Sequence, residues 1–259
     1  MNMSFYTASV GAMMQQRRMN VQANNIANVN HYGFKAEKAS FSQLMYRDVI
    51  GIDEAELPKG TGTRIEKTAT DFSSSGYFDT GYLFDYAIVG DGFFALYDPK
   101  NGEISFTRDG SFSMSQFFTT PAQPEEPEID PVTGEAIQSE PEEVWRLSDN
   151  YGRFVLDSQG GFIEIDPEHK DANLDVGVFD YAIHDGMRHA DAARFLPTEK
   201  NGALYLGTGE AKRGMIELSN VDLAQEFIKV IESQRAYSYA LKMCMTSDEI
   251  ETTINGLRS

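Results

Sequence analysis

The sequence predicts an α+β fold in which long N- and C-terminal helices pair as a coiled coil and flank a β-rich, antiparallel middle domain. Three observations predict it. All nine prolines lie between Pro58 and Pro197, so both ends of the chain lack the strongest helix breaker. Each end carries apolar residues at heptad spacing. The middle carries short apolar runs that are separated by turn signals.

The N-terminal helix is expected from about residue 4 to residue 28, a length of roughly 37 Å at the usual rise per residue. One stripe at heptad spacing consists of Met3, Val10, Met14 and Val21. The stripe turns polar where it continues, because five asparagines crowd residues 20–30. Gly33 offers the permissive backbone at which the helical segment would stop.

The C-terminal helix is expected to begin in the stretch SNVDLAQEF, where Ser219 and Asp222 have the spacing of a capping box. An alternating four-three spacing then predicts a helix of about 35 residues. The seam consists of Leu223, Phe227, Val230, Gln234, Tyr237, Leu241 and Cys244, and Ile250, Ile254 and Leu257 resume it after a phase shift. Burying each large apolar side chain is worth about 1.5–3 kcal/mol, so this stripe needs a partner helix. The alternative is that both helices pack on the middle domain.

The middle domain is expected to contain many short strands, typical of an antiparallel barrel or a sandwich-like domain. The predicted strands are Tyr86–Val89, Phe93–Tyr97, Glu103–Thr107, Arg153–Leu156, Phe162–Ile165 and Gly177–Tyr181. Asn101-Gly102 and Asp109-Gly110 are hairpin signals, because both pairs tolerate positive φ. The predicted turn residues of this domain are Gly90, Gly92, Asp109 and Gly110.

The expected domain division has four parts. Residues 1–47 hold the N-terminal helix and the segment after it, 48–80 form a connection, 81–215 form the middle domain, and 216–259 hold the C-terminal helix. Residues 121–143 interrupt the middle with five prolines and eight acids but no Lys or Arg. This composition predicts a solvated insert, with an acidic contact loop as the alternative.

Charge and composition exclude several classes of protein. The net charge of −18 argues against nucleic-acid binding, which needs clustered Lys and Arg. Residues 1–47 are the exception, with five basic residues and the single acid Glu37. This asymmetry suggests that the two parts of the chain meet each other or that copies of the chain associate electrostatically, with chance on a solvated helix face as the alternative. No apolar run is long enough for a membrane span, and no secretory signal pattern opens the chain. Cys244, the only cysteine, is expected to be a packed side chain.

The best candidates for chemistry lie in HDGMRHADAARF. His184, Asp185, His189 and Asp191 have suitable ligand types for a metal-dependent enzyme, but their spacing fits neither a helical pair nor a familiar zinc pattern. We therefore expect no metal, no cofactor and no small-molecule substrate. A monomeric β-domain binding module with accessory helices is a third class, distinct from both an enzyme and a self-assembling structural protein.

Four blocks carry a resemblance. GAMMQQRRMNVQANNIANVNHYGFK, DYAIVGDGFF, FTRDGSF and the segment from ELSNVDLAQEF to INGLR resemble the bacterial flagellar basal-body rod and hook proteins, in the same order and over nearly the whole chain. The middle blocks and the length of 259 residues are similar to the rod proteins, the distal type above the proximal type. The chain departs from the family pattern in its 121–143 insert. It also departs in IGIDEAELPKGTG, which is short for the distal type.

The resemblance implies a structural, non-enzymatic rod subunit in the basal body, needed for motility. It would cross the inner membrane unfolded through the flagellar export apparatus, without a cleaved signal. It would then assemble with copies of itself and with other rod and hook subunits, with basal-body rings as further candidate partners. The product would be a helical tube that transmits torque and is lined by the terminal helices around an export channel. A hook or hook-associated axial protein is the alternative.

The predicted assembly interface joins both helices and the asparagine block. It consists of Val10, Met14, Val21, Asn24, Asn25, Ile26, Asn28, Gly33, Leu223, Phe227, Val230, Gln234, Tyr237 and Leu241. Asparagines at seam positions would select one register among copies, at some cost in stability. The same letters are also compatible with a helix C-terminus that runs into a loop.

Overall fold

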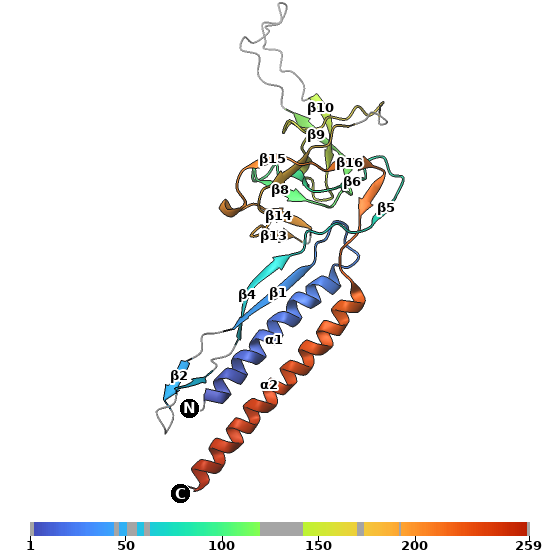
Figure 1. Cartoon of the computed structure of the whole chain (residues 1–259). Coiled ribbons are helices and arrows are strands. Elements are labelled where there is room, and N and C mark those ends of the chain that lie inside the picture. The colour runs from blue at the N-terminus through green and yellow to red at the C-terminus, as the bar shows by residue number, and fades with distance from the viewer. Residues whose placement is uncertain are drawn as a thin grey trace, which may run out of the picture. The chain divides into compact units, whose positions relative to one another are not determined.

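A computed structural model describes residues 3–43, 47–50, 56–59, 63–119, 142–169, 174–191 and 193–257 (Figure 1). The chain divides into two compact units. One comprises Met1–Ser73 with Ser219–Ser259 and is called here the helical unit; the other, Ser74–Leu218, is called the β unit. Most of the predicted acidic insert and much of IGIDEAELPKGTG fall outside the described residues.

The helical unit is built on two long helices that lie side by side in opposite directions (Figure 1). Helix α1 spans Met3–Ala27 and helix α2 spans Leu223–Leu257, so the predicted bounds of α1 are one residue late and the predicted 35-residue length of α2 is confirmed. The hydroxyl groups of Ser4 and Ser247 are 3.1 Å apart, so the first turn of α1 lies beside Ser247 of α2. The predicted α+β class, with terminal helices around a β-rich antiparallel middle, is confirmed.

A β-hairpin-like pair accompanies the helices, and the sequence analysis did not predict it. Strand β1 (Glu37–Gln43) pairs antiparallel with β4 (Thr63–Thr70), with an irregularity between Ser40 and Phe41. Helix α1 contacts both strands. Between them in the chain, β2 (Arg47–Ile50) pairs with β3 (Glu56–Lys59).

The β unit contains a nine-stranded antiparallel sheet with the order β13-β14-β8-β7-β11-β10-β9, and β12 pairs with both β7 and β15. Its strands are β7 (Phe93–Tyr97), β8 (Ile104–Thr107), β9 (Ser113–Thr119), β10 (Glu142–Ser148), β11 (Phe154–Val155), β12 (Val178–Tyr181), β13 (Arg188–Asp191), β14 (Arg194–Leu196) and β15 (Leu204–Leu206). Two smaller pairs are β16 (Glu210–Arg213) with β6 (Tyr86–Val89), and β17 (Met215–Glu217) with β5 (Tyr77–Asp79). The 3₁₀ turn η1 spans Glu199–Asn201.

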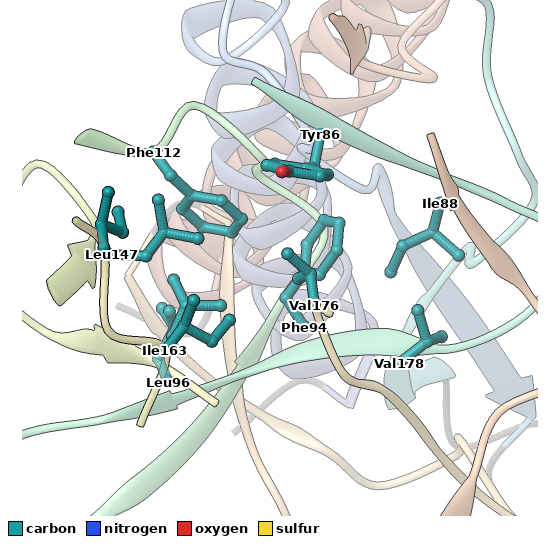
Figure 2. Packing of buried hydrophobic residues seen from close by; sticks show 11 residues of the cluster. Tyr86, Ile88, Phe94, Leu96, Phe112, Leu147, Ile163, Val176 and Val178 are labelled. Atoms are coloured by element: carbon teal, nitrogen blue, oxygen red, sulfur yellow. The ribbon is translucent and has the colours of Figure 1, made fainter. Parts of the chain in front are cut away.

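Strand β7 lies at the centre of the sheet, where it pairs with β8, β11 and β12, and it is buried on both faces. Phe94 and Leu96 point into the main core cluster, where the Phe94 ring meets Phe112 edge-on at 5.2 Å (Figure 2). Phe93 packs on the opposite side against Phe195, with ring centroids 5.9 Å apart. A strand buried on both faces reads as a continuous apolar run, which explains the letters FFAL.

The predicted strands are confirmed in part. Strands β6 and β7 have the predicted bounds, while β8 begins one residue later, and Phe162–Ile165 forms isolated bridges rather than a strand. The hairpin expected at Asp109-Gly110 is wrong, because β8 pairs with β7 and β14 while β9 pairs with β10. The turn at Gly102 has the expected positive φ, 67°.

Candidate assembly surface

The face that α2 presents to α1 includes only part of the predicted seam, because the helix is rotated relative to the prediction. Eight of the ten buried or half-buried positions of α2 follow a regular four-three spacing, with Lys229 and Ala236 beside them, and Cys244 Sγ lies 3.8 Å from the Phe5 carbonyl oxygen at one of the eight. These positions are Glu226, Val230, Ser233, Tyr237, Ala240, Cys244, Ser247 and Glu251. Val230, Tyr237 and Cys244 belong to the predicted seam. The other five positions hold Ser233, Ala240 and Ser247, with Glu226 and Glu251 at the two ends, in place of large apolar residues.

The rotation leaves large apolar side chains of α2 facing away from α1. Phe227 is 50% exposed, and Leu223 and Leu241 of the predicted seam are exposed as well. Gln234 shares this surface. We define the outer stripe of α2 as the exposed side chains Leu223, Phe227, Ile231, Leu241 and Met245, which follow four-residue steps on either side of a polar gap.

The predicted stripe of α1 serves the strands of its own chain. The Met14 sulfur accepts a hydrogen bond from the Ile65 backbone N–H of β4 at 3.4 Å, and Met14 is buried. The Arg18 guanidinium stacks over the Phe41 ring of β1 at 5.7 Å. Val10 and Val21, like Ile26, are half-buried. Part of the predicted interface is therefore covered within one chain.

Three asparagines of the block have partners in their own chain. The amide of Asn25, which is buried, donates to the Glu37 carbonyl and accepts from the Glu37 N–H, both at 2.9 Å. The Asn28 side chain donates to the Asn24 carbonyl oxygen at 2.9 Å, which satisfies a carbonyl in the last turn of α1. Asn24 itself is exposed. Gly33, with φ 65°, lies six residues beyond the helix end, in the turn that leads to β1.

Sequence reasoning missed a second amide that joins three segments of the helical unit. Asn220 accepts from the Ala36 N–H at 2.7 Å and donates to the Asp71 carbonyl at 2.7 Å. Lys35, fully buried, donates its ammonium to the Ser73 carbonyl at 2.8 Å. Both residues lie in the quoted family blocks, but nothing in their spacing shows which backbone groups they bind.

Helix α2 is capped by one of the two predicted residues. Asp222 accepts from the Ala224 and Gln225 N–H groups at 3.0 and 3.2 Å, so it is the N-cap residue. Ser219 lies outside the helix, where its hydroxyl accepts from the Val221 N–H at 3.4 Å. The carboxylate also opposes the helix dipole at this end.

In the β unit, the turn glycines are required by close approach. A Cβ on Gly110 would lie 1.6 Å from the Tyr86 carbonyl oxygen, and a Cβ on Gly92 would lie 2.5 Å from a Val178 methyl group. Gly90 and Gly92 also have positive φ, 111° and 129°. Gly110 does not need positive φ, so its glycine is explained by space rather than by the turn type that the sequence suggested.

Asp109 and its neighbour Arg108 have different roles. The Asp109 carboxylate accepts from the Ser111 N–H at 3.0 Å, as a turn residue does. Arg108 is buried and forms a salt bridge with the fully buried Glu217 at 3.2 Å. It also donates to the Gly90 carbonyl at 2.8 Å. Residues far apart in the chain are thus joined inside the β unit.

Asp71 and Tyr86 are two of the five titratable groups among the described residues whose pKa is shifted by a structural cause. Lys38, 2.6 Å from the Asp71 carboxylate, holds the pKa of Asp71 below its ordinary value of 3.8. Burial raises the pKa of Tyr86 above 10.0. Both groups belong to the packing of their own unit.

The histidine-containing segment is occupied by contacts of its own. His184 Nε2 lies 2.6 Å from Asp180 Oδ1, the His189 ring packs edge-on against Phe195 at 4.7 Å, and Asp191 pairs with Arg194 at 2.9 Å. Over the described ranges, no three His, Cys, Asp or Glu side chains gather as a metal site. Among the helices of the described residues, none is long and apolar enough to cross a bilayer.

Three family models match separate parts of the chain. "Flagella basal body rod protein" matches residues 5–35, "Flagellar hook protein FlgE/F/G D1 domain" matches 87–119, and "Flagellar basal body rod FlgEFG protein C-terminal" matches 212–257. These ranges hold α1 with its asparagine block, the β6–β9 segment with the Gly92 and Gly110 turns, and α2.

Curated relatives match nearly the whole chain. A flagellar basal-body rod protein FlgG of Buchnera aphidicola subsp. Schizaphis graminum is 30% identical, with 95% of this chain and 96% of the relative covered. FlgG of Bacillus subtilis is 29% identical with the same coverage. FlgF of Caulobacter vibrioides is 29% identical, with 96% and 95% covered. The chain therefore belongs to the flagellar basal-body rod protein family, as a structural subunit and not an enzyme, and its FlgG relatives support the distal-rod type.

Proposed function

We propose that the α1–α2 pair is the helical core through which copies of this chain pack laterally into a rod. One observation carries the proposal: α2 turns serine and alanine toward α1 and leaves its outer stripe exposed. An apolar stripe of this length is worth about 1.5–3 kcal/mol for each large side chain that a neighbour covers. A second copy, or another axial subunit of the flagellum, supplies that cover.

Within one copy, we propose that the two helices pair as a coiled coil. The four-three spacing of the buried α2 positions supports this, because such spacing keeps one face toward a partner helix. Ser233, Ala240 and Ser247 in the seam allow a close approach of the two backbones. The same proposal includes the predicted role of Asn24 in selecting one register among copies. Asn25 and Asn28 already bind backbone groups of their own chain.

The experiment changes the outer stripe while leaving the seam intact. The double substitution Phe227→Ser and Ile231→Ser removes two exposed side chains, so we expect the isolated chain to keep its helical circular dichroism. We expect the amount of assembled material, measured by sedimentation, to fall at least tenfold. A rod-deficient strain that is supplied with the double variant should remain non-motile. Phe78→Ser, an aromatic of the β unit that is 54% exposed against 50% for Phe227, is the matched control and should assemble normally. Normal assembly of the double variant would contradict the proposal.

The remaining expectations extend this function. We propose that assembly yields a helical tube that transmits torque, with the terminal helices lining an export channel and residues 81–215 outside them. The chain would reach the basal body through the flagellar export apparatus without a cleaved signal, with basal-body rings as further neighbours. The four-part domain division and a contact role for residues 121–143 stay part of the proposal. Exchange of the insert for a Gly-Ser linker of equal length tests that last point through motility.

A further inference from the structure

One face of the large sheet carries a row of aromatic side chains. Leu96 and Val155 belong to the core cluster, so their strand neighbours Tyr97 and Phe154 point to the opposite face of the sheet, because side chains alternate along a strand. The Phe154 ring contacts two others edge-on, with centroids 5.3 Å from Phe117 and 5.8 Å from Phe162. We define the aromatic platform as Tyr97, Phe117, Arg146, Phe154 and Phe162.

Arg146 lies over three rings of the platform and has few hydrogen-bond acceptors. Its guanidinium carbon is 4.5 Å from the Phe162 centroid and 5.6 Å from those of Phe117 and Phe154. Among the described residues, the one hydrogen-bond partner of the guanidinium is the Glu164 carboxylate at 3.3 Å, which is 62% exposed, and the buried Nε has none. An exposed ion pair of this kind contributes at most about 1 kcal/mol. A further carboxylate at the rim of the platform would therefore add to the binding of this cation.

Two rings of the platform are open to solvent at a spacing that suits polyproline II. Phe117 is 38% exposed and Phe162 is 40% exposed. Because both contact Phe154, their centroids lie at most about 11 Å apart, and one turn of polyproline II, three residues, advances about 9.3 Å. Proline-rich segments in this conformation bind aromatic-lined grooves. Prolines three residues apart on such a segment would meet the two exposed rings in turn.

The insert has prolines at this spacing. Its first residues, PAQPEEPE, place Pro121, Pro124 and Pro127 at every third position, so all three share one face of a polyproline II helix. Glu125 and Glu126 stand between the last two prolines. The segment thus offers apolar rings along one face with carboxylates beside them, which the aromatic rings and the arginine of the platform match.

The insert also begins and ends at the edge of the platform. Strand β9 ends at Thr119, which pairs with Glu142 at the start of β10, and Phe117 lies two residues before that end. Half of the chain between Thr119 and Glu142, about ten residues at roughly 3.1 Å each, reaches about 30 Å, well past the two exposed rings. A segment tethered this closely has an effective concentration on the order of millimolar, which favours the chain's own insert over that of another copy.

We propose that the insert of the same chain docks on the aromatic platform as one turn of polyproline II. Pro124 then lies on Phe117 and Pro127 on Phe162, and the two glutamates between the prolines lie level with the arginine of the platform. Residues 120–123 provide the reversal from the end of β9. This inference rests on the contact role proposed for the insert and does not require copies of the chain to assemble.

Limited proteolysis of the full-length, unassembled chain tests the docking. A glutamate-specific endoprotease cuts after Glu125, Glu128 and Glu135, and a free peptide of residues 120–141 supplies the intrinsic rate at each bond. We expect cleavage after Glu125 and Glu128 to be at least tenfold slower in the chain than in the peptide, which corresponds to about 1.4 kcal/mol of docking or more. The bond after Glu135, outside the docked turn, should be cut at similar rates in both.

Substitutions on either side of the contact supply the variants. Phe117→Ser with Phe162→Ser should raise cleavage at both protected bonds to the peptide rate, while tryptophan fluorescence in a urea titration shows that the β unit stays folded. Pro124→Ser with Pro127→Ser leaves the platform unaltered and should also abolish protection relative to a peptide with the same substitutions. Pro131→Ser is the matched control and should keep the protection.

The charged part of the contact has its own readout. Glu125→Gln with Glu126→Gln should raise cleavage after Glu128 about threefold, in the range of an exposed ion pair, whereas Glu135→Gln should leave that rate unchanged. An unchanged rate in the Glu125 and Glu126 double variant would overturn the pairing with Arg146.

Three results would overturn the docking as a whole. Cleavage of the unsubstituted chain at the peptide rate would show that the insert is not bound. Protection that survives both the phenylalanine and the proline double substitutions would show that another contact causes it. Protection that grows with the concentration of the chain would show that the insert binds a second copy. Each result is obtained on unassembled chain, so each leaves the proposal of lateral rod assembly intact.

Discussion

The buried pair of Arg108 and Glu217 gives the sharpest test of how the β unit is held together. Arg108 is 3% exposed and Glu217 is 0% exposed, and their charged atoms are 3.2 Å apart. At that distance, an effective dielectric constant of about 20 gives an attraction of roughly 5 kcal/mol. Glu217→Gln removes this attraction but keeps the side-chain shape and the acceptor for the Ser75 N–H.

We expect Glu217→Gln to lower the free energy of unfolding by about 3 kcal/mol, the lower end of the range for a broken buried pair. The value stays at that end because Arg108 keeps two carbonyl acceptors, at Gly90 and Ile88, and lies 5.5 Å from the Phe93 ring. Trp145, the only tryptophan, packs against the β-unit core, so its fluorescence in a urea titration reports this unit.

A double-mutant cycle separates the pair from its surroundings. Arg108→Met alone leaves a buried carboxylate without its guanidinium, and we expect about 3–5 kcal/mol of destabilisation. The double variant has no unpaired charge, so its loss should be at least about 2 kcal/mol smaller than the sum of the single losses. Additive losses, or a cost below about 1 kcal/mol for Glu217→Gln, would refute the reasoning.

Three further predictions concern single positions. Gly110→Ala forces a Cβ into a backbone carbonyl oxygen of β6, so the urea midpoint seen by tryptophan fluorescence should fall by the equivalent of about 3 kcal/mol. Gly76→Ala in the same unit, whose new Cβ would meet only a Leu218 methyl group at 3.9 Å, should change that midpoint little. Asp222→Ala removes the α2 cap and should cost about 1 kcal/mol in helix stability, measured by thermal circular dichroism, with recovery in Asp222→Asn. Asp71 has a lowered pKa in the fold, so its contribution to stability is present above pH 3.8 and is lost as pH falls through the folded value. Lys38→Met should move that folded pKa back toward 3.8 in a carboxylate NMR titration, and an unchanged value would contradict the assigned cause.

The helices could be predicted from the sequence because their signals are local. The absence of proline, the Asp222 cap and the four-three spacing all act within a few residues, and they locate α2 and its length. Strands β6 and β7 were equally accessible, because their apolar runs end at Gly90 and Gly102. The prediction was partly wrong at Ser219. Both Ser219 and Asp222 are residue types that cap helices, and the sequence alone did not show that Asp222 is the N-cap residue.

The strands beside α1 could not be predicted because their own pattern is weak. β1 and β4 consist largely of polar residues. Phe41 and Ile65, two of their few apolar residues, contact Arg18 and Met14 of α1, and the sequence does not show these contacts. The amide of Asn25 fixes the start of β1 through both backbone groups of Glu37. Such a role depends on a turn that no residue spacing specifies.

The pair of Arg108 and Glu217 lies beyond local reasoning for another reason. The two residues are 109 positions apart in the chain, and each alone is an ordinary charged residue near a glycine-rich turn or a strand. Only the sheet pairings that bring β17 beside β5 and β8 beside β7 bury them together. The quoted block FTRDGSF contains Arg108, but the sequence does not identify Glu217 as its partner.

The rotated seam of α2 has a physical cause that also bears on function. A helix that packs against several neighbours carries apolar residues on more than one face, so its spacing fits more than one seam and the sequence cannot say which is internal. Here the internal seam took Ser233, Ala240 and Ser247, which bury little apolar surface. Cover of the outer stripe by a second copy would add to the burial that the pair gains from its own contact, so helix formation and assembly should be coupled. Helical circular dichroism measured before and after assembly should therefore rise, and an unchanged signal would show that the pair is complete without neighbours.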